Sequence, residues 1–336
     1  MTATYQRIVL ASRPQGRVTP ANFRLETLPL PTPGPGQLLV RNHYLSLDPY
    51  MRGRMNEGKS YAAPQALNET MIGGTAGVVE ASDHAGFRVG DHVVGALGWQ
   101  ECAASDGSGL TKIDVSRVPM SAYLGPAGMP GVTAWFGLNK ICEPKRGETV
   151  LVSAASGAVG SVVGQLAKRA GCRAVGIAGG RDKCRYVVEE LGFDACLDHR
   201  AHTSVREMSG ALKAAAPDGI DCLFENVGGV GFDAGLARMN PHARVAVCGL
   251  IAGYNGEDIA IHNVLALVVM RIRLQGFIVS EHLEHWPQAL AELVAAIADG
   301  SLKYRETIAD GLAAAPAAFI GLLEGRNLGK QLVKLA

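Results

Sequence analysis

The stretch from Glu148 to Gly171 constrains the fold of this chain most strongly. It reads E-T-V-L-V-S-A-A-S-G-A-V-G-S-V-V-G-Q-L-A-K-R-A-G: an apolar run, a turn of small residues and an apolar segment of helical period. This order predicts a strand, a tight turn and a helix. Glycines in such a turn let the backbone approach a pyrophosphate, and the N–H groups at the start of the helix attract it. The turn therefore predicts a dinucleotide site.

The turn departs from the usual fingerprint G-x-G-x-x-G. Ala154 and Ala155 stand where the early glycines would be, and only Gly157 and Gly160 keep the later spacing. Close packing of a helix on a strand also selects small residues, so the turn alone leaves both readings open. If it binds a dinucleotide, the residues expected against the cofactor are Ala155, Ser156, Gly157, Ala158, Val159 and Gly160.

The next predicted strand, Arg173 to Ile177, bears on which dinucleotide is bound. Enzymes that prefer NAD usually place Asp or Glu at the tip of this strand, about 20 residues past the glycines. Here the tip is Gly179-Gly180, followed by Arg181 and Lys183, which can neutralise a 2′-phosphate. We therefore predict NADP(H), bound by Gly180, Arg181 and Lys183. The alternative is that both cations are a solvated helix start, and Asp182 is expected to cap a helix that begins near Lys183.

Length and composition bound the class of protein. At 336 residues the chain favours two domains, and 48% hydrophobic with 19% charged residues is ordinary for a globular protein. The net charge is +1 and the Lys and Arg residues are scattered along the chain, which argues against a nucleic-acid partner. The N-terminus lacks an apolar leader, and Val264 to Met270 is too short to span a bilayer. Seven cysteines without a C-x-x-C pair suit reduced thiols. We expect a soluble, cytoplasmic protein.

The pattern of elements changes near Pro126. Before it, short β segments are separated by Gly and Pro, which is typical of a β-rich, barrel-like region. After it, strands alternate with helices, which predicts an α/β fold with a parallel sheet. A helix is expected at Trp286 to Ala298, and strand-like segments after Leu302 return to the first domain. The expected strands are 149–153, 173–177, 194–198, 221–226, 244–249 and 273–279, and the expected domains are 1–126 plus 302–336 (β-rich) and 127–301 (dinucleotide-binding).

This order of domains resembles the medium-chain dehydrogenase/reductase superfamily, and within it the zinc-independent leukotriene dehydrogenase/prostaglandin reductase group, which includes alkenal double-bond reductases and bacterial curcumin reductase. The matching segments are L-S-L-D-P-Y-M-R-G-R-M, G-M-P-G-V-T-A-W-F-G-L, S-A-A-S-G-A-V-G-S-V-V-G-Q-L-A-K, E-N-V-G-G, C-G-L-I-A-G-Y-N, Q-G-F-I-V and N-L-G-K. The resemblance implies a doubly wound Rossmann domain inserted into a GroES-like domain. It also implies NADPH in a cleft between them and reduction of the C=C bond of α,β-unsaturated aldehydes and ketones.

The resemblance also implies site residues. The residues expected to line the cofactor on this ground are Thr133, Asn226, Cys248, Gly249, Ile251, Tyr254, Phe277, Ile278, Val279 and Asn327. For Asn226 an Asx turn before the following glycines is an equal alternative. The family often has a tyrosine near the adenosine ribose where this chain reads L-D-H-R, so His199 or Arg200 would take that contact.

No metal is expected. Zinc relatives use a cysteine early in the β domain, a histidine in G-H-E, and a four-cysteine lobe, because zinc needs such donors at fixed spacing. This chain has Leu45 to Asp48 and Gly73 to Thr75 at the first two places. His282 and His285 lie three residues apart without a third donor nearby, which is typical of a solvated helix start.

Alkene reduction needs hydride at the β-carbon, a polarised carbonyl oxygen and a proton at the α-carbon. A tyrosine hydroxyl, protonated at neutral pH, suits the last two tasks. We predict Tyr254 as the polarising or proton-donating group and Tyr50 as a wall of the enone pocket. Either ring can instead simply pack, and water or a ribose hydroxyl can deliver the proton. Arg52 and Arg54 either meet a substrate carboxylate or are exposed.

Two other functions stay open. The chain can be a zinc-independent quinone reductase, which shares the fold and NADPH. It can also be a non-catalytic NADPH-binding structural protein, although its near-neutral charge argues against RNA. The partners expected are therefore a small unsaturated carbonyl substrate and, because Arg273 to Val279 would end the parallel sheet, a second copy of the chain in a homodimer.

Overall fold

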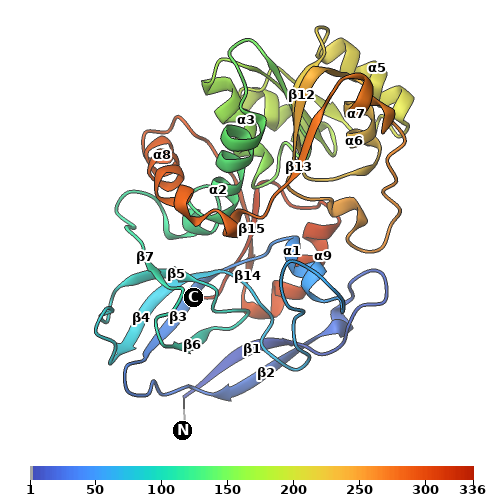
Figure 1. Cartoon of the computed structure of the whole chain (residues 1–336). Helices are drawn as coiled ribbons and strands as arrows, with labels where there is room; N and C mark the ends of the chain where they lie inside the picture. Colours follow the sequence, from blue (N-terminus) through green and yellow to red (C-terminus); the bar gives the residue numbers. More distant parts are fainter. Residues whose placement is uncertain (1–2) are drawn as a thin grey trace. The chain divides into compact units, whose positions relative to one another are not determined.

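The computed structural model describes residues 3–336, which divide into two compact units (Figure 1). The central unit is Gly125–Arg305, and the terminal unit is the chain before it together with Glu306–Ala336. That each one folds independently as a domain, with the limits expected above, stays a prediction.

The central unit is built on a parallel sheet with the strand order β10-β9-β8-β11-β12-β13. Every neighbouring pair in it is parallel, and the order reverses direction between β8 and β11. This is the doubly wound Rossmann arrangement that the alternating pattern predicts. Its strands are β8 (Thr149–Val152), β9 (Arg173–Ala178), β10 (Ala195–Asp198), β11 (Ile220–Glu225), β12 (Met239–Val247) and β13 (Arg273–Gly276).

The helices of the central unit form two groups. Helix α2 contacts both α3 and α8, α5 contacts α6, and Figure 1 shows the two groups on opposite sides of β12. The start of α5 is fixed locally by a capping box, in which the Glu207 amide donates to Ser204 Oγ at 3.3 Å. The helices are α2 (Met129–Phe136), α3 (Gly160–Arg169), α4 (Arg181–Arg185), α5 (Val205–Ala215), α6 (Gly229–Leu236), α7 (Leu265–Val269) and α8 (Trp286–Ala298).

Three expectations for this unit need correction. The strand expected at 244–249 runs from Met239 to Val247. The last strand stops at Gly276, and Val279 already belongs to a short 3-10 turn, so the expected strand 273–279 is too long. Helix α4 begins at Arg181 and its N-cap is Gly180, so Asp182 is not the cap. The exposed Asp182 carboxylate instead pairs with Arg185, one turn later, at 2.9 Å.

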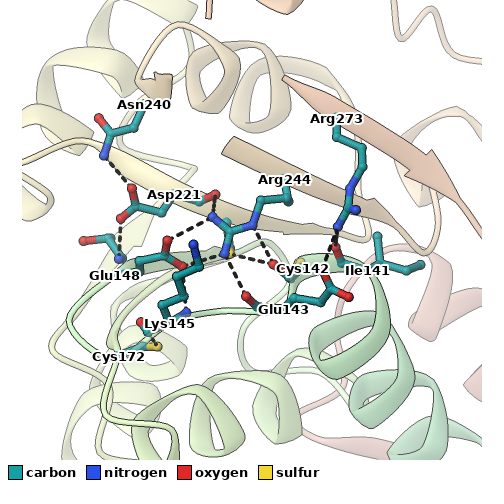
Figure 2. Close-up of polar contacts among 12 residues, drawn as sticks. Ile141, Cys142, Glu143, Lys145, Glu148, Cys172, Asp221, Asn240, Arg244 and Arg273 are labelled. Carbon is teal, nitrogen blue, oxygen red and sulfur yellow. Dashed lines mark hydrogen bonds and ion pairs between the residues drawn. The ribbon is translucent and has the colours of Figure 1, made fainter. Parts of the chain in front are cut away.

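The guanidinium of Arg244, a residue of β12, joins this strand to the amino ends of β8 and β11 (Figure 2). It donates to the carbonyl of Cys142 at 2.7 Å and that of Glu143 at 2.9 Å, and pairs with the Glu148 carboxylate at 2.6 Å. Partial burial alone would raise the pKa of Glu148, but Arg244 outweighs it and holds that pKa below its ordinary value. Arg244 therefore caps the helical segment that ends at Cys142 and anchors it to the sheet.

The terminal unit contains a mostly antiparallel sheet of order β14-β15-β3-β4-β5-β7, with β6 also paired to β3, and the hairpin β1-β2. Its core gathers Phe23, Trp99 and Phe319, whose rings stack or meet edge to face. No helix within residues 3–336 is long and apolar enough to cross a membrane. Its elements are β1 (Thr4–Leu10), β2 (Phe23–Pro29), β3 (Leu38–Ser46), α1 (Tyr50–Arg54), β4 (Thr75–Ser82), β5 (His92–Gly95), β6 (Cys102–Ser105), β7 (Thr111–Lys112), β14 (Glu306–Asp310), α9 (Ala315–Leu323) and β15 (Lys330–Lys334).

Candidate functional site

The turn after β8 brings the strand and helix α3 into close contact. Ala154 adopts a left-handed backbone with φ 48°, a conformation that usually requires glycine. A Cβ added to Gly160 would lie 2.4 Å from the Ala154 carbonyl oxygen, so no larger residue fits there. The chain thus makes the turn of the dinucleotide fingerprint with alanine at an early position and glycine at the last one.

The start of α3 presents unsatisfied amides. The Gly157 amide donates to Ala154 and the Ser161 amide to Gly157, whereas the amides of Ala158, Val159 and Gly160 have no acceptor among the residues that the structure describes. The N-cap, Val159, supplies no side-chain acceptor. Three unsatisfied amides at a helix N-terminus are suited to an anionic group such as a pyrophosphate.

Asp198 joins the ends of β9 and β10. Its Oδ1 accepts from the amide of Gly180 at 2.8 Å and from that of Arg200 at 2.9 Å. Partial burial would raise the pKa of Asp198, but these two amides outweigh it and lower the pKa. Gly180 can follow the path required because its φ is 101°. Asp198 therefore shapes the tip that sequence analysis assigns to the adenosine end of a dinucleotide.

Three basic side chains gather at this tip. Burial lowers the pKa of Lys183, and the nearby charge of Arg200 lowers it further. Burial likewise lowers the pKa of His199, with Arg200 the next cause. A Cβ on Gly179 would lie 2.8 Å from His199 Nε2, so the imidazole packs directly on the glycine pair. Burial, and after it the charge of Arg200, thus disfavours the charged forms of Lys183 and His199, so an added negative charge would be favoured at this place.

The carboxyl ends of β8 and β11 meet at Ser153, Glu225 and Asn226. The Asn226 amide donates to Ser153 Oγ at 2.7 Å, and its side-chain Nδ2 donates to the Ser153 carbonyl at 2.8 Å. Asn226 therefore bridges two strand ends with its side chain as a donor. This point is the reversal in strand order, where open α/β sheets bind their ligands.

Glu225 is fully buried at this reversal. Its Oε1 accepts from Ser153 Oγ at 3.0 Å and from the Gly228 amide at 2.7 Å, and also accepts from the Val227 amide. Its Oε2 has no hydrogen-bond partner among the described residues. Burial raises the pKa of Glu225 to about 7, although the four hydrogen-bonding groups around it act in the opposite direction.

The loop after β12 carries Tyr254. Its Oη accepts from the Leu250 amide at 3.4 Å, and a Cβ on Gly249 would lie 3.1 Å from the same oxygen. The amides of Cys248 and Gly249 both donate to the backbone oxygen of Glu225, at 2.8 and 3.2 Å. Burial of the Cys248 thiol, with Glu225 the second cause, raises its pKa to about 12, so the thiol stays protonated. Cys248, Gly249, Ile251 and Tyr254 thus follow the same sheet edge as Asn226.

The remaining predicted residues of the central unit pack rather than form polar clusters. Thr133 is buried in α2 and its Oγ1 donates to the Met129 carbonyl at 2.7 Å. Phe277 follows β13 and its ring lies 5.5 Å from that of Phe136. Ile278 and Val279 come next on the chain, beyond the carboxyl end of β13.

Tyr50 and Asn327 belong to the terminal unit. Burial, followed by the charge of Asp48, raises the pKa of Tyr50, so the phenol is neutral at any physiological pH. Asn327 Nδ2 donates to the Gly329 carbonyl at 2.7 Å. Lys330, the residue after Gly329, forms a buried ion pair with Asp48: its Nζ donates to Asp48 Oδ1 and to the Leu47 carbonyl, each at 2.7 Å.

Arg52 corrects an expectation. It is 3% exposed, and its guanidinium donates to Asn56 Oδ1 at 2.6 Å and to the Gly16 carbonyl at 2.7 Å. It braces the loop after α1, so it is neither a solvated arginine nor placed by these contacts toward a substrate carboxylate.

Sequence reasoning missed Ser153, Asp198 and Glu225 as parts of the site. Each acts through a neighbouring strand end, and although Ser153 and Glu225 lie within quoted segments, the motifs do not show which strand ends meet. The signal that could have found them is a polar residue directly after a buried strand, as Glu225 closes the run I-D-C-L-F-E.

No group of three or more His, Cys, Asp or Glu side chains within residues 3–336 is arranged to hold a metal ion. His282 instead stacks on Phe136 with ring centroids 4.2 Å apart, and His285 lies 5.6 Å from the same ring.

Two family models match the chain: "N-terminal domain of oxidoreductase" over residues 6–113 and "Zinc-binding dehydrogenase" over residues 158–296. The NADPH-dependent curcumin reductase of Escherichia coli is 46% identical over 98% of this chain and 97% of its own. The chain belongs to the curcumin and alkenal reductase group of the medium-chain dehydrogenase/reductases. Membership in this group makes the chain an oxidoreductase, and confirms the resemblance drawn from the seven segments.

Two further members of the reductase group are close in sequence or structure. The NADP⁺-dependent 2-alkenal reductase of Nicotiana tabacum is 44% identical over 92% of this chain and 91% of that one. The crystal structure of CurA from Vibrio vulnificus in complex with NADPH is 45% identical, covers 98% of this chain and 99% of that one, and has a TM-score of 0.93. The reductase fold therefore extends over nearly the whole chain.

Proposed function

We propose that this reductase uses NADPH to reduce the C=C bond of α,β-unsaturated aldehydes and ketones, with hydride added at the β-carbon. The observation that carries the cofactor is the cluster of Lys183, His199 and Arg200 beside the tip of β9, the strand tip at which an NAD enzyme has a carboxylate. The bacterial and plant relatives are named for curcumin and for 2-alkenals, both of which carry an alkene conjugated to a carbonyl.

The residues present fit NADPH at three places along one sheet edge. The amides of Ala158, Val159 and Gly160 would bind the pyrophosphate, and the basic cluster with Gly180 and Arg181 would bind the adenosine 2′-phosphate. The loops after β11 and β12 would hold the nicotinamide end, through Asn226 and the segment from Cys248 to Tyr254. When bound, NADPH supplies the hydride.

The chain's own contribution is to polarise the carbonyl and move a proton. We assign Tyr254 to this task, because accepting a hydrogen bond from the Leu250 amide polarises its O–H toward a further acceptor. That acceptor is the carbonyl oxygen of the substrate, on which negative charge develops as the β-carbon is reduced. Tyr50, held neutral by burial and by Asp48, is proposed as a wall of the enone pocket.

We also propose that the reductase is a homodimer. Strand β13 is at the edge of the parallel sheet, which leaves one side of its backbone for pairing with a second copy. Near it in the sequence, Leu265 and Val268 of α7 are 71% and 74% exposed, and Leu274 of β13 is 40% exposed. Size-exclusion chromatography with light scattering tests this, and a monomer at micromolar concentration would contradict it.

The cysteines of the described residues are free thiols, which fits the cytoplasmic location that we propose.

The test of function is steady-state oxidation of NADPH against a panel of 2-alkenals, aryl enones and quinones. We expect the unsaturated aldehydes and ketones to be reduced at the C=C bond, as product analysis by mass spectrometry and NMR would show. Turnover of quinones alone would favour the quinone reductase alternative. Binding of NADPH without turnover of any acceptor would favour a non-catalytic role.

A further inference from the structure

The buried carboxylate of Glu225 is unexplained by the chemistry proposed above. It is 0% exposed, the groups that hydrogen-bond to it are neutral, and no ion pair involves it among the residues described. Burial of an ionisable group without a cation is costly, so a carboxylate in such a place needs a reason other than stability.

The contacts of Glu225 gather three strand ends into one unit. Its side chain binds Ser153 from the end of β8 and the amides of Val227 and Gly228 from the end of β11. Its backbone oxygen accepts from Cys248 and Gly249 at the end of β12.

The segments held in this way are those that the proposed function assigns to the nicotinamide half of the cofactor. Asn226 is itself tied to Ser153 by two hydrogen bonds, and Leu250, which donates to Tyr254, directly follows Gly249. The basic cluster at the tips of β9 and β10 is held separately, by Asp198. The two halves of the edge therefore depend on different carboxylates.

We propose that Glu225 is a positioning residue that sets the nicotinamide half of the cofactor site by holding the carboxyl ends of β8, β11 and β12 together. This inference rests on the proposed function, because it takes NADPH as the ligand of that edge. The positioning role of Glu225 requires an acceptor oxygen at the place of Oε1 and does not require a negative charge. Glutamine keeps such an oxygen, whereas alanine removes it and leaves the amides of Val227 and Gly228 without their acceptor.

The experiment compares Glu225→Ala and Glu225→Gln with the wild type. The affinity for NADPH is measured by fluorescence titration, and that for 2′,5′-ADP, a fragment that reaches only the adenosine half, by calorimetry. Asp233→Ala is the matched control. Asp233 is 2% exposed, and its Oδ1 accepts hydrogen bonds from the amides of His262 and Asn263 at 3.1 and 2.7 Å, neither of which is an assigned cofactor residue.

We expect Glu225→Ala to weaken NADPH binding at least tenfold and 2′,5′-ADP binding by less than threefold. Glu225→Gln and Asp233→Ala should keep both affinities within threefold of the wild type. Hydrogen exchange should show faster exchange of the Val227, Gly228 and Cys248 amides in Glu225→Ala but not in Glu225→Gln. An unchanged NADPH affinity in Glu225→Ala, or an equal loss for both ligands, would overturn the proposal.

If Glu225→Ala does not fold, Ser153→Ala provides the second test. It removes the hydroxyl that joins Glu225 to the Asn226 amide, and should weaken NADPH binding at least threefold while leaving 2′,5′-ADP within twofold. No selective loss in this variant would also overturn the proposal. Failure of the proposed function looks different: without the cofactor the wild type itself would bind neither NADPH nor 2′,5′-ADP, and without the reaction it would bind NADPH but turn over no enone.

Discussion

Replacing Glu225 with glutamine should make the stability of the reductase less sensitive to alkaline pH. The native carboxyl has its pKa raised from the ordinary 4.5 to about 7 by burial. Between these values the unfolded chain has released a proton that the native protein still holds, so the native state is favoured by low pH. This stability is fully present below pH 4.5 and is lost as the pH rises through 7. Glutamine does not titrate, so the variant lacks this loss.

The size of the effect follows from the two pKa values. A rise from 4.5 to about 7 corresponds to roughly 3.4 kcal/mol of stability lost between strongly acidic and alkaline pH. About 0.8 kcal/mol of this is already lost at pH 5, and nearly all of it at pH 8.5. The free energy of unfolding of Glu225→Gln, relative to the wild type, should therefore increase by roughly 2.5 kcal/mol between pH 5 and pH 8.5.

Urea unfolding at pH 5, 7 and 8.5, monitored by tryptophan fluorescence, measures this difference. Trp135 and Trp286 both lie in the central unit with Glu225 and report its unfolding. The measurement at pH 5 is an internal control, because the native carboxyl is then protonated and resembles the amide. The quantity to follow is the free energy of unfolding of Glu225→Gln minus that of the wild type. If it stays constant or falls as the pH rises, the buried carboxyl does not titrate near neutrality and the reasoning is refuted.

Three other substitutions test separate parts of the structure. Lys183→Ala should raise the KM for NADPH at least tenfold and leave that for NADH within threefold, because only NADPH carries the 2′-phosphate; an unchanged preference in steady-state assays would contradict this assignment. Tyr254→Phe should lower kcat more than threefold, above roughly 0.7 kcal/mol of barrier, and a smaller loss would favour water or a ribose hydroxyl as the proton source. Lys330→Met should lower the free energy of unfolding by about 3–5 kcal/mol, because it leaves Asp48 buried and charged, and Asp48→Asn in the same chain should restore most of it.

The fold could be predicted from the sequence to a large extent because its signals are local. The alternation of strands and helices after Pro126 predicts a parallel sheet, and the small residues from Ala154 to Gly160 mark its central turn. The limits of elements were less secure. Gly276 ends β13 three residues before the apolar run does, because the chain leaves the sheet while it is still apolar.

The candidate site could be predicted only where a motif is continuous along the chain. Asn226 and Tyr254 belong to such motifs. Glu225 and Ser153 also lie in matched segments, but their contact with each other depends on β8 and β11 being neighbours in the sheet, more than 70 residues apart in sequence. Strand order and register decide which polar side chains share an edge, and neither can be read from local composition. The same holds for Arg52, whose burial depends on a carbonyl 36 residues earlier.

The left-handed Ala154 has a consequence for how dinucleotide-binding chains are recognised. An L-residue other than glycine pays about 1–2 kcal/mol for this backbone conformation, a modest cost that a well-packed strand and helix can absorb. What the cofactor meets is the path of the peptide groups, and that path is the same whichever residue follows it. A search by glycine spacing therefore selects the residues that make the turn easily, and passes over chains that make the same turn under strain. Replacing Ala154 with glycine would bring this chain closer to the fingerprint without changing the turn that the fingerprint describes.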